Sequence, residues 1–436
     1  MKQTYKILSL AVAIIMAAGS ALAQENGISS PYSRYGFGQL GTLSTGFNSA
    51  MAGIGIGMQN GREVNPINPA SYAGLDSLTF LFDIGASVQQ SNYRGSGKAH
   101  HTDVTFDYMT MGFRAAKHLG LSIGVLPISH VGYNASSTST VTDSYNHSEP
   151  ITRKTTYTGN GGLHEVYIGA GWAPVRYVSV GANIGYVWGD INNATSVTFS
   201  DATVTPSSYT YLSEIRTYNV SAGLQTYIPL NKHNTLTLGA NYTLGHQVNR
   251  KAYMIKSATD TLLARNAYEL PHTIGAGASW NHKNKLRIGV DYLLQKWGQC
   301  RYPWYTRQNG VDTYQATTGY LRDSWRVAAG AEYRPLKKGM RWSEYITYRA
   351  GFAITTPYVN VEGANGVWAK GPTSYLATVG VNLPIMNVFG GRCSVNLAAQ
   401  YERSQPAFAG QIKENYFRLC IGVNFNEQWF MKWKVN

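Results

Sequence analysis

The chain contains about fourteen short segments in which apolar and polar residues alternate. The clearest two carry the apolar residues Val178, Val180, Ala182, Ile184, Tyr186 and Trp188, and Leu236, Leu238, Ala240, Tyr242 and Leu244. A β-strand directs successive side chains to opposite faces, so each segment has one apolar and one polar face. When nearly every strand has this pattern, with glycine and threonine on the polar face, a closed barrel with lipid outside satisfies all the backbone hydrogen bonds.

The connections between these segments alternate between short and long. The short ones lie near residues 116–117, 173–174, 229–234, 281–284, 335–343 and 384–391. The long polar ones lie near residues 92–102, 134–162, 190–214, 249–270, 298–320, 357–373 and 403–414. Outer-membrane barrels have short periplasmic turns, long outer loops and an even number of strands. The sequence therefore predicts an all-β fold, a closed antiparallel transmembrane β-barrel of about 14 strands, with both chain ends on the periplasmic side.

The N-terminus has the features of a secretory signal peptide. Lys2 and Lys6 precede an apolar run over residues 7–18, and Ala21-Leu22-Ala23 fits the cleavage pattern. The alternative, a membrane-anchoring helix, requires a longer apolar run and no cleavage site. We therefore expect residues 1–23 to be a signal peptide.

The segment that follows the predicted signal peptide lacks the alternating pattern of barrel strands. It contains glycine clusters and the turn-rich stretch Asn65-Pro66-Ile67-Asn68-Pro69. A barrel of this width cannot fill its lumen with its own inward side chains. We expect residues 24–77 to form an N-terminal hatch, or plug, in the lumen, residues 78–426 the barrel, and residues 427–436 a periplasmic tail.

Composition excludes several other classes of protein. The net charge of +14 is not gathered into basic runs with interleaved aromatic residues, so we expect no nucleic-acid partner. Three cysteines argue against a disulfide framework. A soluble β-sandwich is the main structural alternative, but a sandwich does not carry an apolar face of similar length on every strand. Aromatic residues at the segment ends, such as Trp172 and Trp280, suit the interfaces of a bilayer.

Catalytic and metal-binding motifs have plain structural explanations. Ser122 lies in the pattern G-x-S-x-G, but the catalytic version needs a strand-to-helix turn and here the serine is in the middle of a strand. His100, His101 and His118 have no partners at metal-ligand spacing. We expect no enzymatic activity, no metal site and no cofactor.

Charged residues on the polar faces of the predicted strands are the candidate functional residues. They are Asp83, Arg287, Asp291, Arg326, Glu332, Arg349, Glu402 and Arg418. One interpretation is a hydrated inner wall with paired charges. The other is that some of them hold the hatch in place or line a path for a substrate. An irregular alternation near Tyr108 and Met109 also predicts a β-bulge in the wall.

Two stretches of the sequence resemble a known family. They are Asn68-Pro69-Ala70 before the first strand and residues 159–189, GNGGLHEVYIGAGWAPVRYVSVGANIGYVWG. Through them the chain resembles the FadL family of outer-membrane transport proteins for hydrophobic compounds. It implies a fourteen-stranded barrel whose N-terminal hatch blocks the lumen, with Asn68, Pro69 and Ala70 as hatch residues. It also implies that a hydrophobic molecule enters from outside and leaves sideways through the wall. The chain departs from the family after Phe425, where it continues as NEQWFMKWKVN.

These observations support one main hypothesis and two alternatives. The first is a FadL-like barrel in the cell outer membrane that takes up lipid-like or fatty-acid-like small molecules past the hatch. The second is a non-transporting barrel subunit of an outer-membrane secretion or assembly complex, with partner proteins bound through its outer loops or C-terminal tail. The third, a lipid hydrolase, lacks a lipid-facing Ser and His pair on adjacent strands. Outer-membrane lipid is an expected partner under all three.

Overall fold

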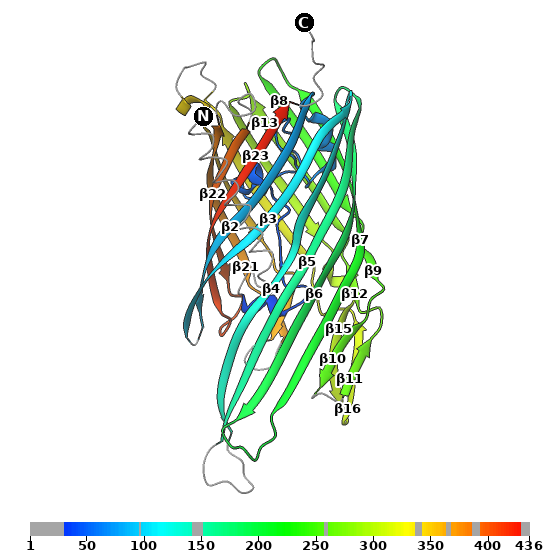
Figure 1. The fold of residues 1–436 in the computed structure, drawn as a ribbon, viewed down its shortest axis with the longest axis vertical. Coiled ribbons are helices and arrows are strands. Elements are labelled where there is room, and N and C mark those ends of the chain that lie inside the picture. The colour runs from blue at the N-terminus through cyan, green and yellow to red at the C-terminus, as the bar shows by residue number, and fades with distance from the viewer. Residues whose placement is uncertain are drawn as a thin grey trace.

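The computed structural model describes residues 30–95, 97–141, 151–256, 260–335, 342–362, 368–385 and 393–428. Fourteen antiparallel strands form a closed barrel, because the first barrel strand pairs with the last (Figure 1). The strands are β2 (Thr79–Arg94), β3 (Lys98–Ala116), β4 (Leu119–Val141), β5 (Ile151–Val175), β6 (Val178–Phe199), β7 (Ser207–Pro229), β8 (Asn234–Thr243), β13 (Thr273–His282), β14 (Leu286–Gln295), β17 (Ser324–Tyr333), β18 (Thr347–Thr355), β21 (Thr373–Ile385), β22 (Cys393–Gln405) and β23 (Lys413–Gln428). The predicted fold class is confirmed.

Shorter elements lie before the barrel and in the connections between its strands. Before the barrel are η1 (Pro31–Arg34), β1 (Gln39–Leu40), α2 (Gly46–Ser49) and η2 (Pro69–Gly74). In the connections are β9 (His246–Val248), β10 (Ala252–Lys256), β11 (Asp260–Ala264), β12 (Tyr268–Leu270), η3 (Trp297–Gln299), β15 (Tyr302–Gln308), β16 (Val311–Thr317), η4 (Trp342–Tyr345), β19 (Asn360–Glu362) and β20 (Trp368–Lys370).

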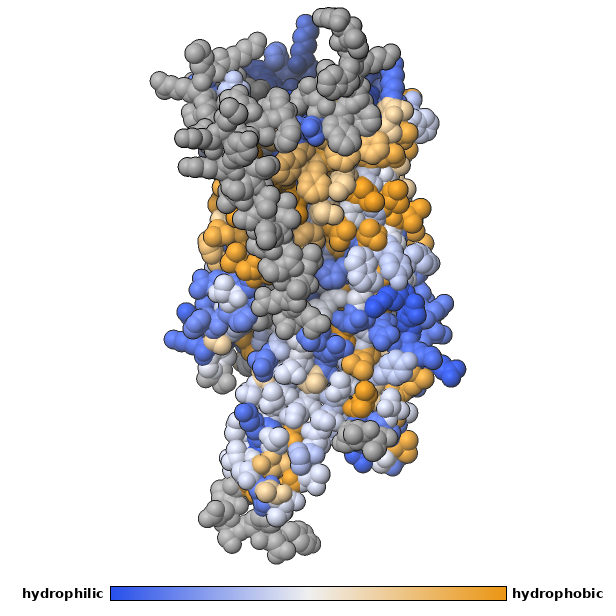
Figure 2. All heavy atoms as spheres, viewed as in Figure 1, coloured by the Kyte–Doolittle hydropathy of each residue, from blue (hydrophilic) through white to orange (hydrophobic). Residues whose placement is uncertain are grey.

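The outer face of the barrel carries the apolar side chains that the alternation predicts. Ile168, Ile184 and Val379 are about 60% exposed, and neighbouring strands present further leucines, valines and tyrosines. Figure 2 shows a band of hydrophobic residues, in orange, across the visible face of the barrel, bordered by hydrophilic residues. In the part of the chain that the structure describes, no helix has the length and apolarity needed to span a bilayer.

The strands of the wall differ greatly in length, and β2, β3, β21, β22 and β23 are intermediate, with 13 to 19 residues. β4, β5, β6 and β7 have 22 to 25 residues each, whereas β8, β13, β14, β17 and β18 have 9 or 10. About ten tilted residues suffice to cross a bilayer, so the four longest strands continue well beyond the apolar band (compare Figure 1 with Figure 2). Much of the predicted outer loops 134–162 and 190–214 is therefore strand.

The N-terminal segment, residues 30–76, lies inside the barrel (Figure 1). The helical turn η2 packs against β3 to β7, and α2 packs against β2, β22 and β23. Phe47, Met51 and Ile54 form a buried cluster with Ala328 and Ala353 of the wall. The predicted signal peptide lies outside the described residues. At the other end, β23 continues through Gln428, and the rest of the predicted tail also lies outside the described residues.

Candidate functional site

The residues Asn68, Pro69 and Ala70 lie against a column of glycines on the inner wall. The column consists of Gly171 on β5, Gly181 on β6 and Gly223 on β7. A Cβ atom added to Gly181 would lie 2.4 Å from the carbonyl carbon of Pro69, and one added to Gly171 would lie 2.4 Å from the Pro69 carbonyl oxygen. The glycines on the polar faces of these strands therefore allow the backbone of the N-terminal segment to approach the wall.

Asn68 connects this contact to the rest of the N-terminal segment. Its side-chain oxygen accepts a hydrogen bond from the Ala70 N–H at the start of η2. Its amide nitrogen donates to the Ile56 carbonyl at 2.8 Å and to two wall carbonyls at 3.3 Å. Asn68 is fully buried, so these bonds satisfy polar groups that have no access to water.

Polar side chains of the wall satisfy the backbone of the N-terminal segment around much of the barrel. The Gln225 amide donates to the carbonyls of Ile56 and Met58, and the Ser279 hydroxyl donates to the Gly57 carbonyl at 2.7 Å. Similar bonds come from Asn183, Asn241, Thr378 and Gln400. Each such bond contributes about 1 kcal/mol, so together they fix the segment in one position.

A buried ion network holds the N-terminal segment near the predicted periplasmic end of the barrel. Arg349 on β18 lies 2.8 Å from Glu332 on β17 and 3.3 Å from Glu63 of the segment, as measured between nitrogen and carboxylate oxygen. The side chain of Asn396 on β22 accepts from Arg349 at 2.7 Å and donates to Glu63 at 2.8 Å. Arg287 lies farther from Glu332 than Arg349 does, at 3.9 Å between nitrogen and carboxylate oxygen.

Two more of the predicted charged residues hold the middle of the N-terminal segment. The Asp291 carboxylate accepts hydrogen bonds from the backbone N–H groups of Gly55 at 2.6 Å and Ile56 at 2.8 Å. The Arg326 guanidinium donates to the Ala52 carbonyl. Asp83 has a different partner. Its Oδ1 atom accepts a hydrogen bond from the hydroxyl of Tyr108, another wall residue, at 2.8 Å.

The wall has a seam between β3 and β4. These strands pair only from Ala116 with Leu119 to Met109 with Val125. Beyond that level β3 continues to pair with β2, and β4 continues to pair with β5, but β3 and β4 no longer pair with each other. The register of β3 shifts so that Asp107 has no opposite residue on β2, which confirms a bulge close to the predicted position.

The N-terminal segment covers part of the β4 edge at this seam. Gln39 and Leu40 of β1 pair with His130 and Ser129 of β4. Farther out, the Ser30 N–H donates to the Gly132 carbonyl. Non-helical or unpaired backbone at membrane depth is tolerated only where protein covers it or where it lines a cavity. The seam is thus the part of the wall where a functional site is expected.

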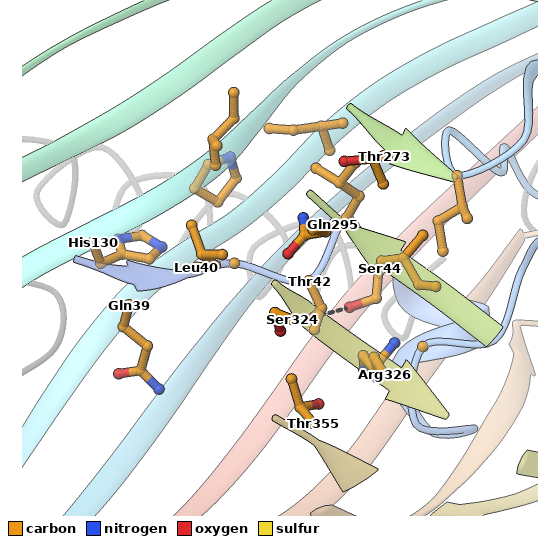
Figure 3. Close-up of a pocket in the computed structure, with 18 of the residues that line it drawn as sticks. Gln39, Leu40, Thr42, Ser44, His130, Thr273, Gln295, Ser324, Arg326 and Thr355 are labelled. Atoms are coloured by element: carbon orange, nitrogen blue, oxygen red, sulfur yellow. Dashed lines mark hydrogen bonds between the residues drawn. The ribbon is translucent and has the colours of Figure 1, made fainter. Parts of the chain in front are cut away.

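A cavity of about 450 Å³ lies between the N-terminal segment and the wall and reaches the seam. Thr105 and Asp107 of β3 and Leu126 and Ile128 of β4 are among its lining residues. Figure 3 shows residues 39–44 crossing this space, with Thr273, Gln295, Ser324 and Thr355 presented by four other strands. The volume falls in the range of small-molecule binding sites.

The remaining predicted residues, Arg418 and Glu402, line the same cavity. Arg418 donates to the Gln89 side chain at 2.9 Å, and the Ser374 hydroxyl donates to Glu402. The cavity also contains Glu165 and Glu414, which the sequence did not single out. Glu414 falls at the end of a region expected to be a loop, and Glu165 lies just before the first apolar residue of an expected strand. In the described part of the chain, no group of three or more His, Cys, Asp or Glu residues could hold a metal ion.

Aromatic residues of the outer connections pack over the N-terminal segment above the cavity. Phe37 is fully buried among Trp297, Tyr302 and Tyr268, with ring centroids 5.4 to 5.8 Å apart. The Tyr302 hydroxyl donates to the Gly36 carbonyl at 2.7 Å. These contacts join the outer connections and the N-terminal segment into one hydrophobic cluster.

Solved structures share this architecture, a closed β-barrel with the FadL fold. The Ralstonia pickettii toluene transporter TbuX matches with a TM-score of 0.55 and 14% identity over 90% of this chain and 98% of that one. The CymD monoaromatic hydrocarbon channel matches with a TM-score of 0.54 and 13% identity over 91% and 99%. A Pseudomonas aeruginosa FadL homologue matches with a TM-score of 0.54 and 11% identity over 92% and 100%. These likenesses confirm the expected resemblance at the level of the fold.

A more specific assignment comes from the sequence as a whole. A family model described as BamG matches residues 4–436, nearly the entire chain, and the protein belongs to that family. A search of curated protein sequences found no match.

Proposed function

We propose that the protein is an outer-membrane barrel that binds a hydrophobic small molecule between its N-terminal plug and its wall and releases it sideways through the seam between β3 and β4. The observation that carries this proposal is that the cavity reaches the level at which the two strands stop pairing. The lipid-like or fatty-acid-like character of the molecule follows from the apolar residues on the seam side, Leu126, Pro127 and Ile128.

A straight route through the lumen fits the contacts less well. It would require the N-terminal segment to leave its wall contacts, including the buried Arg349–Glu63 pair. Removing one partner of a buried ion pair costs about 3–5 kcal/mol, and the hydrogen bonds from Gln225, Ser279 and Asp291 add to this. Sideways release leaves all of these contacts in place, and a hydrophobic solute gains nothing by crossing water.

The test is native mass spectrometry of the protein purified in mild detergent. We expect one bound lipid-like ligand in the unmodified protein. Leu126→Trp fills the cavity at the seam and should lower the ligand-bound fraction at least tenfold. Leu238→Trp is the matched control, because Leu238 is 43% exposed on the lipid face of β8. A ligand-free unmodified protein, or equal occupancy in both variants, would contradict the proposal.

A second candidate function is that of a barrel subunit in an outer-membrane secretion or assembly complex. The observation that favours it is the extension of β4 to β7 beyond the apolar band, which transport across the wall does not require. Affinity purification in mild detergent should then recover stoichiometric partner proteins. The same purification after truncation at Gln428, the last residue of β23, tests whether the C-terminal tail binds them.

A further inference from the structure

The outer part of β4 has an open strand edge that points away from β5. Beyond His130, no strand within the described ranges pairs with this side of β4, whereas β5 pairs with the other side as far as Val141. Asn134 lies nine residues beyond Val125, where pairing with β3 ends, or about 30 Å along the strand. The edge from Asn134 to Val141 is therefore outside the apolar band and largely exposed to water.

The contacts of the N-terminal segment with β4 show which backbone groups of β4 point outward at this open edge. The Gly132 carbonyl accepts from the Ser30 N–H at 2.8 Å, and the Gly132 N–H donates to the Ser33 hydroxyl at 3.2 Å. In an antiparallel ladder the N–H and C=O of one residue point to the same side, and this side alternates along the strand. Asn134, Ser136, Thr138 and Thr140 therefore direct their N–H and C=O groups to the open edge.

This edge lacks the features with which proteins usually block strand addition. Exposed edges typically carry charged side chains, proline or bulges that prevent pairing with another chain. Residues 134–141 read NASSTSTV and contain no charged residue and no proline. The facing outer part of β3 differs, since Lys98, His100, His101 and Asp103 lie within six residues. Of the two unpaired edges that face each other across the outer part of the seam, the β4 edge is thus the one that can accept a strand.

We propose that the β4 edge from Asn134 to Thr140 binds an extended segment of a partner protein by β-strand addition. The pairing would continue an interface that the N-terminal segment has begun at Ser129, His130 and Gly132. Main-chain hydrogen bonds supply the affinity in this mode of recognition. Because Arg153 and Lys154 of β5 lie opposite Ser139 and Thr138, the edge favours a segment that is neutral or acidic. This inference goes beyond the proposed binding of a small molecule.

The test uses the full-length protein purified with its partners from outer membranes in mild detergent. Ser136→Pro combined with Thr138→Pro removes two N–H donors at the open edge and leaves the hydrogen bonds to β5 intact. Proline is tolerated in an edge strand where the N–H that it replaces points away from the neighbouring strand. Ser136→Ala combined with Thr138→Val is the matched control, because it changes the same side chains and keeps the backbone donors. A difference in gel-electrophoretic mobility between unheated and heated samples confirms that each variant forms its barrel.

We expect the proline variant to recover at least tenfold less of one partner protein than the unmodified protein does, and the Ala/Val variant to recover as much. Cross-linking should show that the segment of this partner at the β4 edge is extended. In the purified complex, the amides of Ser136 and Thr138 should exchange slowly, and they should exchange fast once the partner is removed. Equal recovery of the partner by both variants would overturn the proposal. Slow exchange in the isolated chain would also overturn it, because another segment of the chain or a second copy would then cover the edge. Leu126→Trp should leave the partner bound, which separates this proposal from that of the cavity.

Discussion

Arg349 on β18 lies 3.3 Å from Glu63, an acidic residue of the N-terminal segment, and both side chains are almost completely buried. Arg62 and Glu63 are the only charged residues between Tyr35 and Leu75. An arginine in the wall therefore finds its partner in a segment that has almost no other charge. The pair fixes the position of the segment relative to the strands that surround it.

We predict that Arg349→Met destabilises the barrel by about 3–5 kcal/mol, because Glu63 would then be buried without its cation and Glu332 would keep only cations 3.9 Å away. The measurement is the free energy of unfolding in urea, with the protein in lipid vesicles. Arg287→Met is the control: this residue is more exposed and lies 3.9 Å from Glu332, so its loss should cost less than about 1 kcal/mol. Equal effects of the two substitutions would argue against the network.

We predict that Gly181→Ala displaces η2 from the wall. The new methyl group would lie 2.4 Å from the Pro69 carbonyl carbon, and neither backbone can move without breaking other contacts. Overpacking of this kind costs about 1–3 kcal/mol. The same unfolding measurement checks it, with Gly97→Ala as the control, since nothing lies within 4 Å of that added methyl group. An unchanged stability in Gly181→Ala would contradict the contact.

We predict that Asp291→Ala loosens the segment around Gly55 without unfolding the barrel. The substitution removes the acceptor of two charge-assisted hydrogen bonds, each of which contributes about 1.5–3 kcal/mol. Hydrogen exchange at the Gly55 and Ile56 amides should become at least tenfold faster. Exchange at amides of β5 and β6 serves as the internal reference and should not change.

We predict that the contact between the β15–β16 hairpin and β10 weakens in acid. The Lys256 ammonium donates a hydrogen bond to Asp312 at 2.5 Å and holds the pKa of that carboxyl below its usual value. A carboxyl with a lowered pKa contributes stability above its unfolded pKa, and this contribution is lost as the pH falls through the folded pKa. Hydrogen exchange of β16 should therefore accelerate below about pH 4. Asp312→Asn should abolish this pH dependence.

The sequence predicted the parts of the fold that contact lipid. Residues such as Val178, Val180 and Ile184 alternate because every second side chain of a wall strand meets hydrocarbon. The sequence predicts loops where the outer parts of β4 to β7 lie, because beyond the membrane neither face of a strand needs to be apolar. The segment NASSTSTV shows this well: it forms a strand but carries no apolar alternation.

The candidate site was predictable in part. Asp291, Arg326 and Arg349 were identified because they interrupt the polar face of a strand with a charge, and all three contact the N-terminal segment. Glu63 was missed because it is not on a strand, although its isolation in a segment with few charges was a usable signal. The seam depends on which neighbouring edges pair, and this is a non-local property that the irregularity near Tyr108 does not reveal.

The most direct test of release through the seam is an experimental structure of the protein in lipid nanodiscs, determined without removing bound lipid. We expect β3 and β4 to be unpaired beyond Met109 and Val125, with elongated ligand density beside Leu126 and Ile128 that reaches the surrounding lipid. A continuous β3–β4 ladder across this level, with no ligand between the N-terminal segment and the wall, would contradict it.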